Sequence, residues 1–212
     1  MRLILASTSP RRKDLLALLN IPFEVIEPEY QEQIMVDVPP EAQAWTFALG
    51  KAQSCARSRA ECLVLGSDTL IAVGTTILGK PADRAQAEAM LRRLRGREHR
   101  IFTAVALCCA AYGAQEVAVD AVQVWMNPFS DADLESYLEG GEWQGKAGAY
   151  SIQGRGGDFI ERIDGDFTAA VGLPLKTVAS LLTDQGVTPG VSVDELYRAK
   201  PYPNWNRFNP SR

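Results

Sequence analysis

Apolar residues along this chain fall into two patterns, short continuous runs and longer stretches with helical spacing. Short runs of this kind are typical of β-strands, and the almost unbroken run "CLVLGSDTLIAV" is typical of a strand at the centre of a sheet. The strands are expected at residues 3–6, 22–26, 62–73, 77–81, 100–111 and 116–126.

Helices are predicted where apolar residues recur every three or four positions after a capping residue. Ser9 is expected to cap a helix that has a proline at its first position, where the missing N–H costs nothing. Asp83 with Gln86, and Ser130 with Asp133, are spaced like capping boxes. The helices are expected at residues 10–19, 39–59, 84–95, 130–140 and 174–185.

The order of these elements indicates the fold class. Strands alternate with helices in the first half of the chain. In the second half, the stretch "FIERIDGDF" contains a turn-prone Asp-Gly pair and predicts a hairpin. We therefore expect an α/β protein with a mixed β-sheet.

The end of the chain differs in composition from the rest. After Gly186 the sequence is rich in Pro, Asn and aromatic residues and shows little periodicity. We expect one domain over residues 1–185, followed by a tail over 186–212. This tail is expected to be irregular, or docked on a neighbour through Trp205 and Phe208.

Composition and charge narrow the classes of function. The formal net charge is −4, which argues against a nucleic-acid partner because such proteins are normally basic. No apolar run is long enough to span a membrane, and the apolar start is too short for a signal peptide. The four cysteines form no Cys-x-x-Cys pair, which favours reduced, buried thiols over disulfides or zinc. We expect a soluble cytoplasmic protein.

The stretch "ILASTSPRRK" places hydroxyl and cationic residues where a strand ends and a helix begins. A helix N-terminus attracts anions because its first N–H groups are free and its dipole end is positive. Ser7, Thr8 and Ser9 add hydroxyl donors, and Arg11 and Arg12 add guanidinium groups that match phosphate oxygens. Two interpretations are open here, a phosphate site and an ordinary capped helix with solvated cations.

Several polar residues stand out from their surroundings. Asp68 lies inside the central apolar run, and a buried carboxylate is costly unless it is paired or bound to a metal. It is either a catalytic or metal-binding group, or a strand-end residue that meets water or a turn. Glu32, Lys51, Lys80 and Gln153 are further candidates, although solvation or snorkelling also accounts for such side chains.

Several chemistries are excluded by the sequence. His99 is the single histidine, so a His-rich metal site is impossible. A Ser-His-Asp triad would have to use His99, and no G-x-S-x-G elbow accompanies it. The sequence contains neither a P-loop motif nor a Rossmann glycine fingerprint. A phosphate site without a P-loop, combined with carboxylates, suggests metal-assisted hydrolysis of a phosphate ester or anhydride.

Six stretches, in this order, resemble the Maf family of nucleoside triphosphate pyrophosphatases: "LILASTSPRRKDLL", "VLGSDTLI", "LGKP", "GREHRIFTAVAL", "KAGAYSIQGRGG" and "IDGDFTAAVGLPL". The resemblance runs from about residue 3 to residue 183. It implies an inosine-triphosphatase-like fold, with an elongated mixed β-sheet, flanking helices and two lobes around a cleft. It also implies cleavage of a nucleotide between the α- and β-phosphates with a divalent cation, Mg²⁺ or Mn²⁺.

The resemblance also implies roles for individual residues. Asp68 matches the family's catalytic acid, which accepts a proton from the attacking water. Glu32 and Asp68 match the metal-binding positions. Arg11, Thr69 and Gln153 match positions associated with substrate choice. The full set of implied substrate-binding residues is Ser7, Ser9, Arg11, Arg12, Lys51, Thr69, Lys80 and Gln153.

The choice of nucleobase is the finest expectation. "KAGAYSIQG" looks like the subfamily that hydrolyses dTTP and UTP rather than the one that prefers 7-methyl-GTP. The Gln153 amide can both donate to and accept from a uracil or thymine edge. Ser151 and the pair Phe167–Thr168 depart from the family's usual pattern near the expected base pocket. The alternatives are a pyrophosphatase for 7-methyl-GTP or another purine nucleotide, and a nucleotide-binding regulator of septum formation. A homodimer is implied by the resemblance alone.

Overall fold

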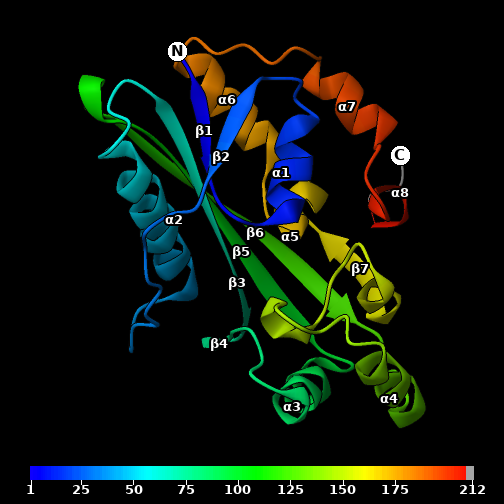
Figure 1. Ribbon diagram of the computed structural model, residues 1–212. Coiled ribbons are helices and arrows are strands. Elements are labelled where there is room, and N and C mark those ends of the chain that lie inside the picture. The colour runs from blue at the N-terminus through cyan, green and yellow to red at the C-terminus, as the bar shows by residue number, and fades with distance from the viewer. Residues whose placement is uncertain (209–212) are drawn as a thin grey trace.

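The computed structural model describes residues 1–208 and shows a seven-stranded mixed sheet with helices on both faces (Figure 1). The strands are β1 (Leu3–Ala6), β2 (Phe23–Ile26), β3 (Leu63–Val73), β4 (Thr76–Leu78), β5 (Glu98–Cys109), β6 (Ala114–Met126) and β7 (Ile160–Asp164). The α-helices are α1 (Pro10–Ala17), α2 (Pro40–Ala56), α3 (Arg84–Leu94), α4 (Asp131–Glu139), α5 (Phe167–Val171), α6 (Leu175–Asp184), α7 (Val193–Ala199) and α8 (Trp205–Phe208). The expected α/β class is confirmed.

The strand order leaves a gap beside the central strand. The order is β2-β1-β3-β5-β6-β7, with β4 paired to β3 outside this path. On one side β3 pairs with β5, while on the other side it pairs with β1 up to Gly66 and with β4 from Ile71. Between these two points, residues 67–70 have no strand partner on that side within the described chain. The polar stretch of β3 therefore lies at an opening in the sheet.

The sheet separates two hydrophobic clusters. Successive side chains of a strand point to opposite faces, so Leu63 and Leu65 join one cluster and Val64 joins the other. One cluster lies under α2, whose Phe47 is 1% exposed. The other cluster lies against α1, α5 and α6, on the opposite face of the sheet (Figure 1).

The hairpin expected at "FIERIDGDF" is wrong. The chain forms one strand, β7, which pairs with β6, and then enters helix α5. Asp166 caps this helix by accepting a hydrogen bond from the backbone N–H of Thr168 at 2.8 Å. The second aspartate of "DGD" thus starts a helix, and Gly165, at φ 124°, provides the bend before it.

The tail expected to be irregular contains helices α7 and α8. Ser192 caps α7 by accepting a hydrogen bond from the backbone N–H of Glu195. Trp205 is fully buried and stacks on Phe167 of the same chain. The tail therefore docks through its aromatic side chains, as part of the larger hydrophobic cluster. The last four residues of the expected tail, 209–212, lie outside the described residues.

Two expectations from composition bear on the described residues. All four cysteines are free and buried. Between residues 1 and 208, no helix combines the length and apolar character needed to cross a bilayer.

Candidate active site

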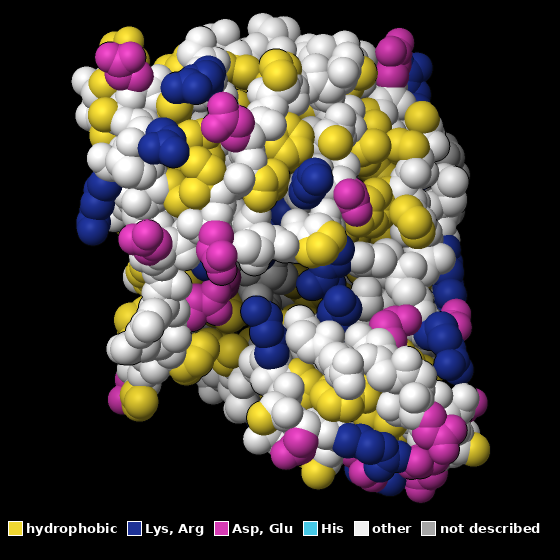
Figure 2. All heavy atoms as spheres, viewed as in Figure 1, with side chains coloured by type: hydrophobic (Ala, Val, Ile, Leu, Met, Phe, Trp, Pro, Cys, Tyr) yellow, Lys and Arg dark blue, Asp and Glu magenta, His cyan; other side chains and the backbone are white. Residues whose placement is uncertain are grey.

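A cleft of about 450 Å³ opens at the gap beside β3. Figure 2 shows a hollow in the middle of this face, with Lys, Arg, Asp and Glu side chains gathered around it. Its charged lining residues are Arg11, Arg12, Glu27, Glu32, Lys51, Asp68, Lys80 and Lys146. Because the cations outnumber the acids in a chain that is acidic overall, this cleft suits a small molecule with several negative charges.

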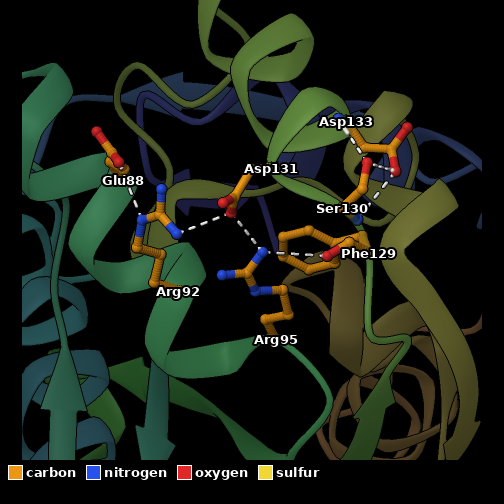
Figure 3. A network of polar contacts seen from close by, with 7 residues as sticks. All are labelled: Glu88, Arg92, Arg95, Phe129, Ser130, Asp131 and Asp133. Atoms are coloured by element: carbon orange, nitrogen blue, oxygen red, sulfur yellow. Dashed lines mark hydrogen bonds and ion pairs between the residues drawn. The ribbon is translucent and has the colours of Figure 1, made fainter.

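Helices α3 and α4, which lie next to the cleft, are joined by an ion-pair network (Figure 3). Asp131 Oδ1 receives hydrogen bonds from Arg92 at 2.8 Å and from Arg95 at 2.7 Å. Arg92 also pairs with Glu88 at 2.9 Å, and Arg95 donates to the carbonyl of Phe129 at 3.2 Å. Exposed pairs of this kind contribute little individually, but they connect the two helices that support the 145–152 wall of the cleft.

The residues of the expected phosphate site, at the start of α1, lie on one side of the gap. Because β1 runs parallel to β3 with Ala6 opposite Gly66, the chain leaves β1 beside the polar stretch in the middle of β3. Ser7 is 4% exposed, and its hydroxyl accepts a hydrogen bond from the backbone N–H of Ser9 at 3.2 Å. Ser9 occupies the N-cap of α1 but makes no side-chain capping bond. Its hydroxyl therefore lies at the cleft with its hydrogen bonds unused within the described chain.

Arg12 is fixed by hydrogen bonds to Gly172 and Thr69. Its Nε donates to the carbonyl of Gly172 at 2.9 Å, and its Nη2 donates to Thr69 Oγ1 at 3.1 Å. Thr69 is in turn 3.0 Å from the hydroxyl of Thr103 on β5. Burial lowers the pKa of Arg12, and the nearby Asp68 carboxylate opposes this effect. The guanidinium is therefore held in one orientation, as recognition of a phosphate requires.

Lys51 connects the two candidate metal-binding acids. Its Nζ lies 2.5 Å from Asp68 Oδ1 and 2.5 Å from Glu32 Oε1. Lys51 is 8% exposed and Asp68 is 4% exposed, so the ammonium and the carboxylate form a buried pair. The Glu32 side chain is 40% exposed and closes the group toward solvent.

Close packing of α2 on β3 brings this pair together. A Cβ atom at Gly66 would lie 2.4 Å from the Ala48 carbonyl oxygen and 2.7 Å from the Ala52 nitrogen of α2. Only a glycine allows the helix to lie this close to the strand. Asp68, two residues further along β3, points to the same face and there meets Lys51.

Electrostatics distinguish the two carboxyl groups. Burial raises the pKa of Asp68 and outweighs the attraction of Lys51 and Arg12. Burial also acts on Glu32, but the hydrogen bond and charge of Lys51, together with the charges of Lys80 and Arg12, outweigh it and lower the pKa of Glu32. A raised pKa in a cleft is typical of a group that exchanges a proton. Asp68 therefore suits a proton acceptor, while Glu32 suits a permanently charged ligand.

The loop that carries Glu32 is fastened by Gln43 of α2. Gln43 is 1% exposed. Its amide oxygen accepts a hydrogen bond from Met35 N–H at 2.9 Å, and its Nε2 donates to the carbonyls of Met35 at 3.0 Å and Val38 at 2.7 Å. These three bonds position the end of the loop that places Glu32 over Lys51.

The remaining expected residues differ in whether they line the cleft. Arg11 and Lys80 both line the cleft, and Lys80 helps to lower the pKa of Glu32. Gln153 is not among the residues that line the cleft. Its Oε1 is buried and has no hydrogen-bond partner among residues 1–208. The role of Gln153 in base recognition stays a prediction.

Three cleft residues, Tyr30, Lys146 and Tyr150, were missed in the sequence. Tyr150 is fixed by the buried His99, whose Nε2 lies 2.7 Å from the tyrosine hydroxyl. Burial lowers the pKa of His99 to about 4, so this histidine is neutral at pH 7. Lys146 and Tyr150 lie within "KAGAYSIQG". The family resemblance of this stretch was the only indication of them in the sequence.

The residues suit a divalent cation held by two carboxylates. Asp68 Oδ2 is buried without a hydrogen-bond partner in the described chain, and the Glu32 carboxylate lies on the same ammonium. No group of three or more His, Cys, Asp or Glu residues converges within residues 1–208. Mg²⁺ fits such a donor set, because it is usually bound by one or two carboxylates together with substrate phosphates and water.

The chain is similar to known proteins over most of its length. A family model described as Maf-like protein matches residues 2–185. A Bacillus velezensis relative named dTTP/UTP pyrophosphatase is 42% identical over 181 residues, 85% of this chain and 95% of that protein. A Symbiobacterium thermophilum relative of the same name is 44% identical over 186 residues, 87% of this chain and 94% of that protein. A solved HAM1 protein from Coxiella burnetii is 15% identical, with a TM-score of 0.48 over 87% of this chain and 99% of that chain.

Proposed function

Because this chain belongs to the Maf-like protein family, we propose that it is a nucleoside triphosphate pyrophosphatase that hydrolyses dTTP and UTP. The reaction joins a water oxygen to the α-phosphorus and breaks the bridge between the α- and β-phosphates. The products are the nucleoside monophosphate and pyrophosphate. The names of the two relatives support the choice of dTTP and UTP.

One observation carries the enzyme proposal over a binding protein. Lys51 holds a carboxylate that is 4% exposed inside a cleft lined by cations. A site that only bound an anion would gain nothing from a buried negative charge, since that charge repels the ligand. A base poised beside the scissile phosphate explains why Asp68 is present.

The residues divide the work of this reaction. Arg12, Arg11 and Lys80 bind the phosphate oxygens and balance their charge. Asp68 accepts the proton of the attacking water, and its raised pKa makes it a stronger base than an ordinary aspartate. Glu32 and Asp68 would hold a divalent cation, Mg²⁺ or Mn²⁺. When bound, such a cation neutralises charge on the phosphates.

The first test measures pyrophosphate release from a panel of nucleoside triphosphates, with and without Mg²⁺ or Mn²⁺. We expect metal-dependent release from dTTP and UTP and little from purine nucleotides, 7-methyl-GTP included. Asp68→Asn should lose about 10²–10⁴-fold in turnover and still bind UTP. Asp37→Asn is the matched control, because Asp37 is exposed and its φ of 59° suits asparagine.

The outcomes separate the alternatives. Fast release from 7-methyl-GTP or another purine would move the assignment to that substrate class. Full turnover by Asp68→Asn would remove Asp68 from the mechanism. Binding of nucleotides without release by the folded wild type would favour a regulatory binding protein.

Two wider expectations belong to the same proposal. The four free, buried cysteines fit a reducing compartment such as the cytoplasm. The homodimer implied by the family is tested by light scattering during size-exclusion chromatography. A single peak at the monomer mass across the working concentration range would exclude it.

A further inference from the structure

The C-terminal segment, defined here as residues 187–208, lies beyond the stretch matched by the family model, which ends at 185. Nevertheless it contacts two walls of the cleft. Resting on the proposed function, we propose that this C-terminal segment positions the nucleotide site, with Asn204 fixing the wall at Ile152 and Trp205 fixing the wall formed by α5.

The first contact is a hydrogen bond to the cleft wall itself. Asn204 Nδ2 donates to the carbonyl of Ile152 at 2.9 Å. Ile152 is 3% exposed and lines the cleft. A Cβ at Gly157 would lie 2.6 Å from the Ile152 oxygen and 3.0 Å from Asn204 Nδ2. The two segments therefore meet at a distance that only a glycine permits.

The loop over residues 152–157 is held from its other side by Glu142, which lies within the stretch matched by the family model. Glu142 accepts hydrogen bonds from the backbone N–H groups of Arg155 at 2.8 Å and Gly156 at 3.0 Å. These bonds fix the far end of the loop, while the bond from Asn204 fixes the end that faces the cleft. Without Asn204, the Ile152 carbonyl would lose its partner next to the bound nucleotide.

The second contact is an aromatic stack on the start of α5. Phe167 lies 5.7 Å from Trp205 at an interplanar angle of 16° and 6.4 Å from Phe208 at 13°. Tyr197 of α7 packs edge-on against Trp205 at 4.9 Å. Phe167 and Trp205 are both fully buried, so the stack sets where α5 begins.

A polar group reinforces this stack and connects it to the cleft. The Tyr197 hydroxyl donates to Asp166 Oδ2 at 2.6 Å and lies 2.9 Å from Thr168 Oγ1. The far end of α5 lines the cleft through Val171, and the next residue, Gly172, accepts the hydrogen bond of Arg12. The C-terminal segment thus acts on the cleft through α5 as well as through Ile152.

These contacts predict an effect on binding rather than on chemistry. Asp68, Lys51 and Glu32 are held by α2 on the other face of the sheet, away from both contacts. A loosened wall at Ile152 should therefore raise the KM for UTP and leave kcat almost unchanged.

Two substitutions of Asn204 separate the lost bond from backbone strain. Asn204→Asp keeps the shape but cannot donate to a carbonyl. Asn204→Gly removes the amide and tolerates the φ of 64° at this position. Asn206→Asp is the matched control, because Asn206 is exposed on α8, two residues beyond Asn204.

The experiment combines steady-state kinetics with hydrogen exchange of the full chain. For both Asn204 variants we expect a KM for UTP raised about fivefold, as loss of one neutral hydrogen bond gives, and kcat within about twofold of wild type. Amides of residues 150–157 should exchange faster, while peptides of α2 and the Asn206→Asp protein stay unchanged.

Each other outcome decides against a specific claim. An unchanged KM, with or without faster exchange, would overturn the proposed role in substrate binding. A loss confined to kcat would also overturn it. If wild type released pyrophosphate from no nucleotide, the proposed function would fail. The exchange rates at 150–157 would then still show whether Asn204 holds this wall.

Discussion

Replacing Lys51 with methionine removes the only hydrogen bond that the buried Asp68 carboxylate makes within residues 1–208 and keeps most of the apolar stem. In the wild type, Lys51 Nζ lies 2.5 Å from Asp68 Oδ1, while Asp68 Oδ2 has no partner in the described chain. Removing one member of a buried ion pair typically costs about 3–5 kcal/mol. The cost has a ceiling, because Asp68 can take up a proton instead of remaining charged.

This ceiling depends on pH. An unfolded aspartate has a pKa of about 3.9, and each pH unit above it adds about 1.4 kcal/mol to the cost of protonation. The ceiling is therefore about 4 kcal/mol at pH 7 and about 1.5 kcal/mol at pH 5. Arg12 still attracts the carboxylate, so we expect Lys51→Met to lose about 3 kcal/mol at pH 7.

Urea unfolding at pH 7 and pH 5, followed by tryptophan fluorescence, measures this loss. Lys13→Met is the matched control, since Lys13 is exposed on α1. The double variant Lys51→Met with Asp68→Asn should recover most of the stability, because no buried charge is left unpaired. Equal destabilisation at the two pH values, or no recovery in the double variant, would refute the reasoning.

Three further changes test other parts of the site. Arg12→Lys removes the fork that bonds Gly172 and should lower kcat/KM for UTP by about 10–100-fold; a change within about twofold would contradict the fixed-fork role. Gln43→Leu breaks three hydrogen bonds and should cost about 2–4 kcal/mol in urea unfolding, with a higher Mg²⁺ requirement as Glu32 loosens; an unchanged Mg²⁺ requirement would show that Gln43 does not position Glu32. The pH profile of kcat/KM should fall in acid with a pKa above 3.9, because burial raises the pKa of Asp68. The stability of the wild type relative to Asp68→Asn should depend on pH in the opposite direction. A raised pKa in the folded state favours the wild type in acid, and this advantage is lost as pH rises through that pKa.

The sequence predicted most of the sheet because its strands are strongly apolar. The run at 62–73 is buried on both sides and gave the central strand β3 within one residue. The spacing of Ser130 and Asp133 predicted a capping box that is present in α4. Signals of this kind are local, and in β3 and α4 the distant contacts agree with them.

The errors arose where distant contacts decide the structure. The Asp-Gly pair at 164–165 is a hairpin signal, but the next aspartate caps α5, and packing of Phe167 on Trp205 favours the helix. The tail lacked periodicity because α7 and α8 have only seven and four residues. Tyr150 could not be assigned, since its partner His99 is distant in sequence.

The close approach at Gly66 has a consequence for how the chain tolerates mutation. Gly66 carries no functional group, yet any side chain there would push α2 away from β3. Because Lys51 and Asp68 sit on these two elements, such a shift would part the ion pair, and a misplacement of about 1 Å can cost on the order of 100-fold in rate. In a screen of all single substitutions for activity, Gly66 should tolerate as few replacements as Asp68 itself. A map of sensitive positions would then extend along the path by which the backbone holds the site, beyond the residues that touch the nucleotide.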